Sequence, residues 1–159
     1  MQRKAVNQQR MKNEMIITVN SLFESVTYHK EANSWKFSFA NNINFFVESF
    51  WRLLKNKSIA WVSRDIEQAW GYSVPEDIID KLTSELTGKC LKEIKVKPDS
   101  SDLELSLTDN LQIEIFISSI RYESYNFMLD NKNYIGLGSG EFGIETATDN
   151  PQIFTTRKL

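Results

Sequence analysis

The sequence contains a single cysteine, Cys90, and a single histidine, His29. One cysteine excludes an intrachain disulfide and is typical of proteins from a reducing compartment. Cys90 and His29 together are too few soft ligands for a structural zinc site. We therefore expect no metal, no cofactor and no Cys- or His-based catalytic residue, and we expect the chain to be cytoplasmic.

The sequence also lacks a long apolar run and an excess of charge of one sign. Its 19 basic and 21 acidic residues give a formal net charge of −2, whereas nucleic-acid binders usually carry a basic excess. No apolar run approaches the ~20 residues needed to span a bilayer, and no signal-peptide pattern is present. We therefore expect neither nucleic acid nor a membrane as partner.

Apolar and aromatic residues are plentiful, at 41% and 12% of the sequence, which is enough for the core of one small domain. Between about residues 20 and 63 apolar and polar residues alternate, as in Trp35–Phe39, and this period is typical of half-buried strands. The alternation returns over about 88–138. Asn41-Asn42 and Asp109-Asn110 are predicted hairpin turns, since Asn and Asp tolerate positive φ.

The two alternating regions align without a gap at a shift of 68 residues, which places Phe23 on Leu91. Farther along, a larger shift pairs Leu54–Lys57 with Leu129–Lys132, so that Ile120–Tyr125 reads as an insertion in the second region. We interpret the match as an internal duplication of a strand meander. The alternative is that any two hairpins share such alternation.

One helix is predicted over about residues 75–87. Pro75 suits a first helical position, and Gly88 suits a C-terminal cap. The apolar residues between them recur at helical spacing; they are Ile78, Ile79, Leu82 and Leu86.

These elements predict an α+β fold, mainly antiparallel β-structure with this one helix. Residues 1–14 are expected to be a polar tail or a loose helix, and residues 146–159 a C-terminal tail. Residues 15–145 are expected to form a single domain with two β repeats, over about 20–63 and 88–138. A sandwich, a barrel and one long sheet all remain open.

Residues Gly138–Gly143 match the pattern G-x-G-x-x-G. In a dinucleotide site this pattern opens a helix within a βαβ unit, and an acidic residue follows about 20 positions later. Residues 144–159 are poor in apolar residues and include Pro151, so we do not expect nucleotide binding. We expect the glycines at 136, 138, 140 and 143 to mark a strand end where another backbone or a large aromatic ring packs closely.

Aromatic residues and arginine are concentrated in two stretches, before Pro75 and in the predicted insertion. Trp, Tyr and Arg are the residues that most often anchor protein interfaces. A core position is an equal alternative for Trp70 and Tyr72. The candidate partner-binding residues are Trp51, Arg64, Asp65, Trp70, Tyr72, Tyr122 and Tyr125.

The alternating segments also carry a resemblance to known proteins. It rests on Trp35–Phe39, Asn41-Asn42 and Ile43–Phe45, repeated at Leu103–Leu107 and Leu111–Ile115. At these segments the chain resembles a loose set of small bacterial proteins, mostly uncharacterised, some of which are immunity partners of secreted toxins. The resemblance covers roughly residues 19–139, and it implies a small non-enzymatic protein defined by what it binds.

Three hypotheses of function follow. The leading one is a non-catalytic protein-binding domain, in its most concrete form an immunity-type inhibitor of a cognate toxin domain. The second is a small-ligand-binding or enzymatic domain that uses a cleft between the two repeats, lined by Glu48, Glu123 and Arg64. The third is a structural subunit that forms a homodimer through an edge strand.

Overall fold

The computed structural model describes residues 14–66, 77–138, 141–146 and 154–158. Within them lie one α-helix, one 3-10 turn and twelve strands. They are β1 (Met15–His29), β2 (Ser34–Phe39), β3 (Ile43–Val47), β4 (Trp51–Lys55), β5 (Ser58–Val62), η1 (Ser63–Asp65), α1 (Ile78–Leu86), β6 (Cys90–Val96), β7 (Leu103–Leu107), β8 (Leu111–Ile115), β9 (Tyr125–Leu129), β10 (Lys132–Gly136), β11 (Glu141–Thr146) and β12 (Phe154–Lys158).

The strands form one continuous antiparallel ladder in the order β12-β11-β10-β9-β3-β2-β1-β6-β7-β8-β4-β5. The ladder folds over at β1, whose first half pairs with β6 and whose second half pairs with β2. The register of β1 shifts in both ladders, between Thr18 and Ser21 and between Phe23 and Ser25. Such bulges let a strand bend and pass from one layer to the other.

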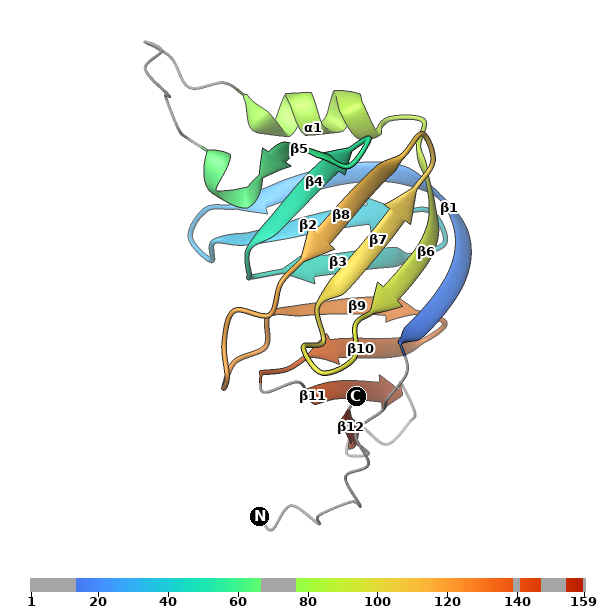
Figure 1. Ribbon diagram of the computed structural model, residues 1–159, viewed down its shortest axis with the longest axis vertical. Coiled ribbons are helices and arrows are strands. Elements are labelled where there is room, and N and C mark those ends of the chain that lie inside the picture. Colours follow the sequence, from blue (N-terminus) through green and yellow to red (C-terminus); the bar gives the residue numbers. More distant parts are fainter. Residues whose placement is uncertain (1–13, 67–76, 139–140, 147–153, 159) are drawn as a thin grey trace.

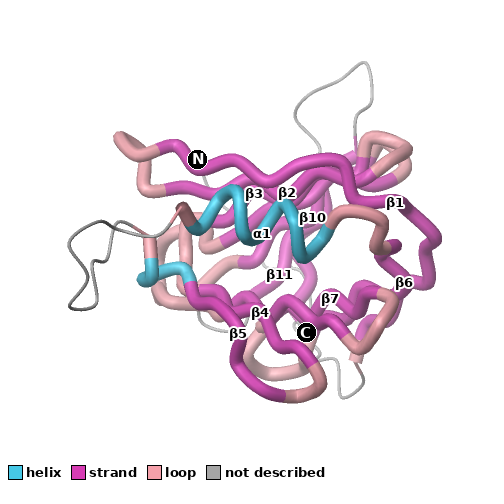
Figure 2. Tube along the Cα trace, turned by 90° about the horizontal axis from the view of Figure 1, so that it is seen from above, coloured by secondary structure: helices cyan, strands magenta, loops and turns pink. Residues whose placement is uncertain are grey.

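The result is a two-layer sandwich. Figure 1 shows β6, β7, β8 and β4 in the front layer, crossing steeply over the strands β2, β3, β9 and β10 of the back layer. Viewed from above, α1 lies across one end of the sandwich (Figure 2), and its closest strand neighbour is β1. No helix in the part of the chain that the structure describes has the length and apolarity to cross a membrane.

The prediction of an α+β fold is wrong, because the protein is essentially all-β. Only one α-helix is present in the described residues, and it has nine residues, so it closes one end of the sandwich without forming a layer. The Asp77 side chain caps it by accepting from Asp80 N at 3.1 Å, and Gly88 follows at φ 79°. Pro75 and Glu76, at the start of the predicted helix, lie outside the described residues.

The predicted C-terminal tail, 146–159, also needs correction, because β12 (Phe154–Lys158) pairs with β11 within it. Its sequence is short and has little apolar alternation. Its backbone forms a strand because the open edge of β11 offers hydrogen-bonding partners, and hydrophobic periodicity does not report such pairing.

The strands of the two β meanders pair in the same register, with each residue of the first meander equivalent to the residue 68 positions later. The pair Val26–Phe37 in the β1–β2 ladder recurs as Ile94–Leu105 in the β6–β7 ladder, and both ladders shift register at equivalent positions. The hairpins that follow, β4–β5 and β9–β10, correspond with an offset of 74, from Trp51 to Tyr125. The sequence alignment of these hairpins, which used Leu54 and Leu129, was therefore displaced by one residue.

Each meander sends its following hairpin into the other layer. β4 pairs with β8 of the second meander, and β9 pairs with β3 of the first. The two crossing segments are held by equivalent backbone hydrogen bonds, from Phe116 N to Phe50 O and from Glu48 N to Ser124 O, both at 3.0 Å. The halves of the sequence are therefore interlocked and share one core.

A single cluster of buried apolar side chains fills the space between the layers. The completely buried Trp51 on β4 reaches from the front layer to the rings of Trp35 and Phe37 on β2, at centroid distances of 4.9 and 5.2 Å. From the back layer, the Tyr125 hydroxyl donates to the Ser101 carbonyl at 2.8 Å. Trp51 and Tyr125 thus join the two layers from equivalent positions.

Candidate functional site

Two of the predicted partner-binding residues, Trp51 and Tyr125, belong to the core, with exposed fractions of 0% and 1%. The prediction of a surface role for them is wrong. Each is the first residue of a strand that crosses to the other layer. Two positions farther along the same strand lies a buried residue, Leu53 after Trp51 and Phe127 after Tyr125. Alternate residues of a strand face the same side, so the phase of these short strands is the signal that places both rings inside.

The other predicted partner-binding residues differ in exposure and in position. Tyr122 is 76% exposed in the segment between β8 and β9. Arg64 is exposed and Asp65 is half-buried in η1. The Asp65 carboxylate accepts from Val62 N at 2.9 Å, so it fixes the turn that presents Arg64. Trp70 and Tyr72 lie outside the described residues.

The structure brings together four residues that we call the arginine–phenylalanine cluster: Phe50, Arg52, Arg64 and Phe116. The rings of Phe50 and Phe116 lie 5.7 Å apart. The guanidinium of Arg64 lies 5.6 Å from the Phe50 ring, and that of Arg52 lies 5.1 Å from the Phe116 ring. These distances are within the range of cation–π attraction, so the four groups form a continuous row.

The cluster is built by the two crossing segments. Phe50 and Phe116 are the residues at which the chain leaves one layer for the other, and a backbone hydrogen bond joins them. Both residues are half-buried. Arg52 points outward because its neighbours Trp51 and Leu53 point inward. The sequence-based prediction missed Arg52 and both phenylalanines as site residues, since nothing local indicates that residues so far apart in sequence meet.

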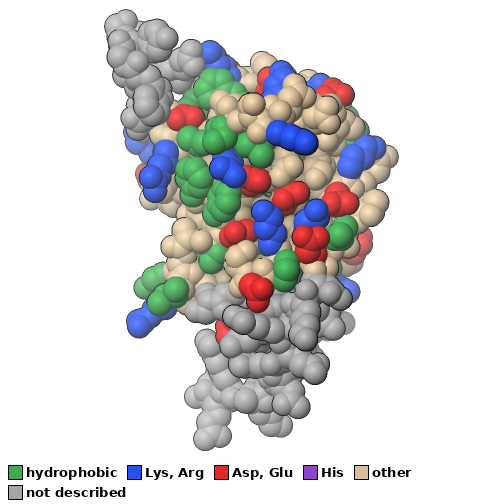
Figure 3. All heavy atoms as spheres, viewed as in Figure 1, with side chains coloured by type: hydrophobic (Ala, Val, Ile, Leu, Met, Phe, Trp, Pro, Cys, Tyr) green, Lys and Arg blue, Asp and Glu red, His purple; other side chains and the backbone are tan. Residues whose placement is uncertain are grey.

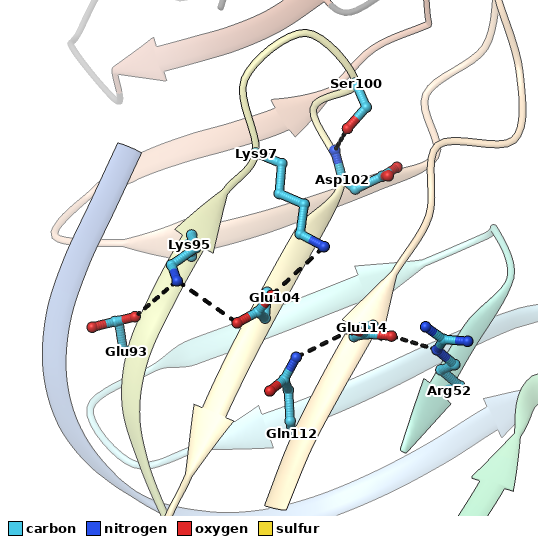
Figure 4. Close-up of polar contacts among 9 residues, drawn as sticks. All are labelled: Arg52, Glu93, Lys95, Lys97, Ser100, Asp102, Glu104, Gln112 and Glu114. Atoms are coloured by element: carbon cyan, nitrogen blue, oxygen red, sulfur yellow. Dashed lines mark hydrogen bonds and ion pairs between the residues drawn. The ribbon is translucent and has the colours of Figure 1, made fainter. Parts of the chain in front are cut away.

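One end of the cluster continues into a polar band on the outer face of the front layer. Arg52 donates to the Glu114 carboxylate, which also accepts from Gln112 at 3.2 Å. Figure 4 shows this band running on to Glu104, which lies between Lys95 and Lys97 with a nearest contact of 3.7 Å. Because each carboxylate in the band has a cationic partner, the band is largely neutralised.

Apolar surface flanks the cluster on the side of β5. Ile59 is 59% exposed and Ala60 is exposed, whereas Trp61 and Val62 are half-buried. Figure 3 shows hydrophobic and basic side chains gathered over β4, β5 and η1, and mixed charges over β6–β8. Groups of this kind contact carboxylates and apolar side chains, and an exposed apolar patch with such a rim is typical of a contact surface.

The expectation that the glycines mark close backbone approach is confirmed at two positions. A Cβ on Gly136 would lie 2.3 Å from the Tyr125 ring, and one on Gly138 would lie 2.2 Å from the backbone of Ile120. The segment that carries Tyr122 is further held by the Ser119 hydroxyl, which accepts from Tyr122 N at 3.0 Å. Tyr122 is therefore displayed on a segment that packs tightly against the start of the β10–β11 connection.

The second hypothesis places a cleft between the repeats. Where the two layers face one another, the structure has a packed core of buried apolar side chains. Glu48 and Glu123 are both exposed, on segments joined by the Glu48 N to Ser124 O hydrogen bond. Glu123 accepts from Asn126 Nδ2 at 2.6 Å. The two carboxylates therefore lie on the surface, away from the apolar interior.

Replacing Tyr125 by phenylalanine is expected to lower the free energy of unfolding by about 1–2 kcal/mol near neutral pH, because the Ser101 carbonyl loses its buried donor. Burial, and secondarily the charge of Asp102, raise the pKa of Tyr125 well above its ordinary value. The folded state thus holds this proton more tightly than the unfolded state. The stability that this proton contributes is complete below about pH 10 and is lost as the pH rises further.

Urea denaturation of both proteins from about pH 8 to pH 11 checks this expectation. The difference in unfolding free energy between the wild type and Tyr125→Phe should shrink above about pH 10, because only the wild type has this proton to lose. Tyr122→Phe, on an exposed ring, is the matched control and should follow the wild type. A constant difference across the range would contradict the assigned cause.

The described residues contain no group of three or more His, Cys, Asp or Glu side chains that could hold a metal ion. The His29 ring is exposed and accepts from Ala32 N at 3.3 Å in the β1–β2 turn. The arginine–phenylalanine cluster, whose groups can bind carboxylates and apolar side chains, is the candidate site that we consider further.

Comparisons of the chain with protein-family models, with curated proteins and with solved structures found no match.

Proposed function

We propose that this chain is a non-catalytic, cytoplasmic protein-binding domain, and that its contact surface is the arginine–phenylalanine cluster with the neighbouring face of β5. The observation that carries the proposal is the row Arg64–Phe50–Phe116–Arg52, with contacts between 5.1 and 5.7 Å. Arginine and aromatic residues dominate the energetics of protein interfaces. A row already ordered in the free protein loses little side-chain entropy on binding.

The two arginines support different parts of such an interface. Arg52 is balanced by Glu114, whose side chain is only 11% exposed, and this pair supports the rings from the sheet side. Arg64 is exposed at the outer end of the row, where its guanidinium suits a carboxylate of a partner. The proposal therefore assigns the charge-dependent contact to Arg64 and the apolar contact to Phe50 and Phe116.

The most concrete form of the proposal is an immunity-type inhibitor that masks a cognate toxin domain. It is supported by the resemblance of the alternating strands to small bacterial proteins of that kind. An acidic contact on the toxin side, opposite Arg64, would complete the surface. Identification of the partner decides this part of the proposal separately from the binding surface.

The test is affinity purification of the tagged protein from its native host, with quantitative mass spectrometry of the bound proteins. We expect one stoichiometric protein partner, and we expect Arg64→Glu to weaken its binding at least about tenfold through charge repulsion. Arg64→Lys should be intermediate, because lysine keeps the charge but not the planar stacking. Lys132→Glu makes an equal change of charge at an exposed position of β10 and should leave binding unchanged.

Two results would count against the proposal. One is the absence of a stoichiometric partner at native expression levels. The other is a partner whose affinity is equal for the wild type and Arg64→Glu, because binding would then use a different surface. Where a partner is found, its expression without this chain should arrest growth if it is a toxin; normal growth would reject the immunity role and leave protein binding in place.

A further inference from the structure

The strands β5 and β10 occupy equivalent places in the two crossing hairpins but have different surroundings. β10 lies between β9 and β11, and pairs with β11 over all five of its residues. β5 is the last strand of the ladder, and within the described ranges its only strand partner is β4. Figure 1 shows β5 at the outer edge of the front layer, beside η1. Among the described residues, one edge of this kind is thus covered by a strand and the other is not.

A bulge divides β5 into two parts. The β4–β5 register shifts between Leu53 and Leu54, so that residues 58–62 of β5 lie opposite only residues 52–55 of β4, and Ala60 is the extra residue. Beyond the bulge the offset is 73, because Leu53 pairs with Trp61 as Phe127 pairs with Tyr134. A bulge is one of the features that limit long strand pairing at an edge. It therefore restricts any added strand to a short one.

We propose that β5 receives a short, acidic, extended segment of the partner protein as an added antiparallel strand, much as β10 receives β11. This proposal rests on the proposed function and specifies the form of its partner. In strand addition, main-chain hydrogen bonds supply affinity and the side chains at the ends supply specificity. On β5 the bulge limits the number of main-chain hydrogen bonds with an added strand. The side chains at its ends therefore contribute most of the specificity for the partner segment.

Charge at both ends of β5 favours an acidic occupant. Lys57 precedes the strand and Arg64 follows it, and both are exposed. Between them the exposed Ile59 offers apolar contact. Transferring the β10–β11 register onto β5 with the offset of 73 places the position of Gly143 opposite Val62, the last residue of β5, since Ile135 pairs with Gly143. The position of Glu141 then lies two residues beyond this pair, on the side where η1 presents Arg64. An acid at that position of the partner segment would meet the arginine.

The same charges oppose pairing with a second copy of this chain. Two antiparallel β5 strands would bring Lys57 of one copy toward Arg64 of the other at both ends of the new ladder. Like charges placed across a strand pair are destabilising. A homodimer through β5 is therefore the less favourable occupant, and its formation is an outcome that the test must detect.

The probe is a synthetic peptide with the sequence of residues 140–147, GEFGIETA, acetylated and amidated, which copies β11 and its two acids. It is titrated into isotope-labelled full-length protein, and amide chemical shifts and hydrogen exchange are recorded. We expect binding on the order of 10⁻⁴ M, as for a short peptide with a small contact area. Shifts should concentrate at 57–64, and amide exchange within β5 should slow.

Two control peptides and one variant test separately the contribution of charge and the formation of a strand ladder. A peptide with glutamine in place of both glutamates should bind at least about fivefold more weakly, because the end charges are lost. A peptide with proline in place of the central isoleucine should not bind, because proline disrupts the ladder. The double variant Lys57→Glu/Arg64→Glu should weaken binding of the acidic peptide at least about tenfold, whereas Lys132→Glu should not.

Three results would overturn the proposal: no saturable binding of the acidic peptide, shifts confined to 132–136 through displacement of β11, or concentration-dependent dimerisation by light scattering with shifts at β5. If the peptide fails while partner capture still depends on Arg64, strand addition is wrong and the proposed function stands. If the wild-type protein captures no partner, the proposed function fails by its own test, whatever the peptide does.

Discussion

Replacing Trp51 by alanine should lower the free energy of unfolding by about 3–5 kcal/mol, which is typical for removing a large buried aromatic side chain. The Trp51 ring is completely buried, and its plane stands nearly at right angles to the rings of Trp35 and Phe37, at 84° and 89°. Its loss would leave a cavity between the layers at the point where β4 enters the front layer. Because a domain of this size is only marginally stable, a large unfolded fraction is expected at 37 °C.

Urea denaturation monitored by far-ultraviolet circular dichroism measures this effect. Trp51→Phe keeps part of the ring and should lose less than half as much stability as the alanine variant. Tyr122→Ala removes an exposed aromatic ring and should change stability by no more than about 0.5 kcal/mol. A Trp51→Ala protein as stable as Tyr122→Ala would contradict the core position of Trp51.

Replacing Gly138 by alanine should also be severely destabilising, by about 3 kcal/mol or more, at the upper end of overpacking effects. The new Cβ would lie 2.2 Å from Ile120 C and 2.3 Å from Ser119 O, which are backbone atoms that cannot rotate away. Either the segment between β8 and β9 must move outward, or β10 and β11 must separate at their connection. Both responses disturb the display of Tyr122.

Gly143→Ala is the matched control, because the nearest atom to its added Cβ is 3.6 Å away, an ordinary contact. Alanine is also the better residue in a strand interior. Thermal denaturation should therefore show Gly143→Ala within a few degrees of the wild type and Gly138→Ala far below it. Equal melting temperatures for the two variants would show that the Gly138 contact is unimportant.

The local elements of this fold are largely predictable from the sequence. Period-two alternation gives the strands of both meanders, and the predicted turns at Asn41-Asn42 and Asp109-Asn110 are confirmed by φ angles between 55° and 64°. The turn Asn56-Lys57 has φ angles of 50° and 67°. It was not predicted, because lysine has no special preference for positive φ. Pairing β4 with β5 imposes that turn.

The exchange of hairpins between the layers was not predictable, and it decides which residues form the site. Alternation tells which side of a strand is apolar, but both layers present equally apolar inner faces, so it does not tell which layer a strand joins. Phe50 and Phe116 meet only because β4 joins β8 and β9 joins β3. For the same reason Trp51 and Tyr125, which look like surface anchors in isolation, become the two links across the core.

The exchanged hairpins also set the order in which the chain can complete its structure during synthesis. β4 and β5 leave the ribosome early, but the inner neighbour of β4 is β8, which ends only at Ile115. Until then the edge of β4 that faces β8 is unpaired, and its apolar inner residues have only part of their core. Nascent chains with unpaired edges are prone to aggregation and recruit chaperones. Because of the interlocked topology, the first half of the chain can complete its fold only after β8, in the second half, has been synthesised.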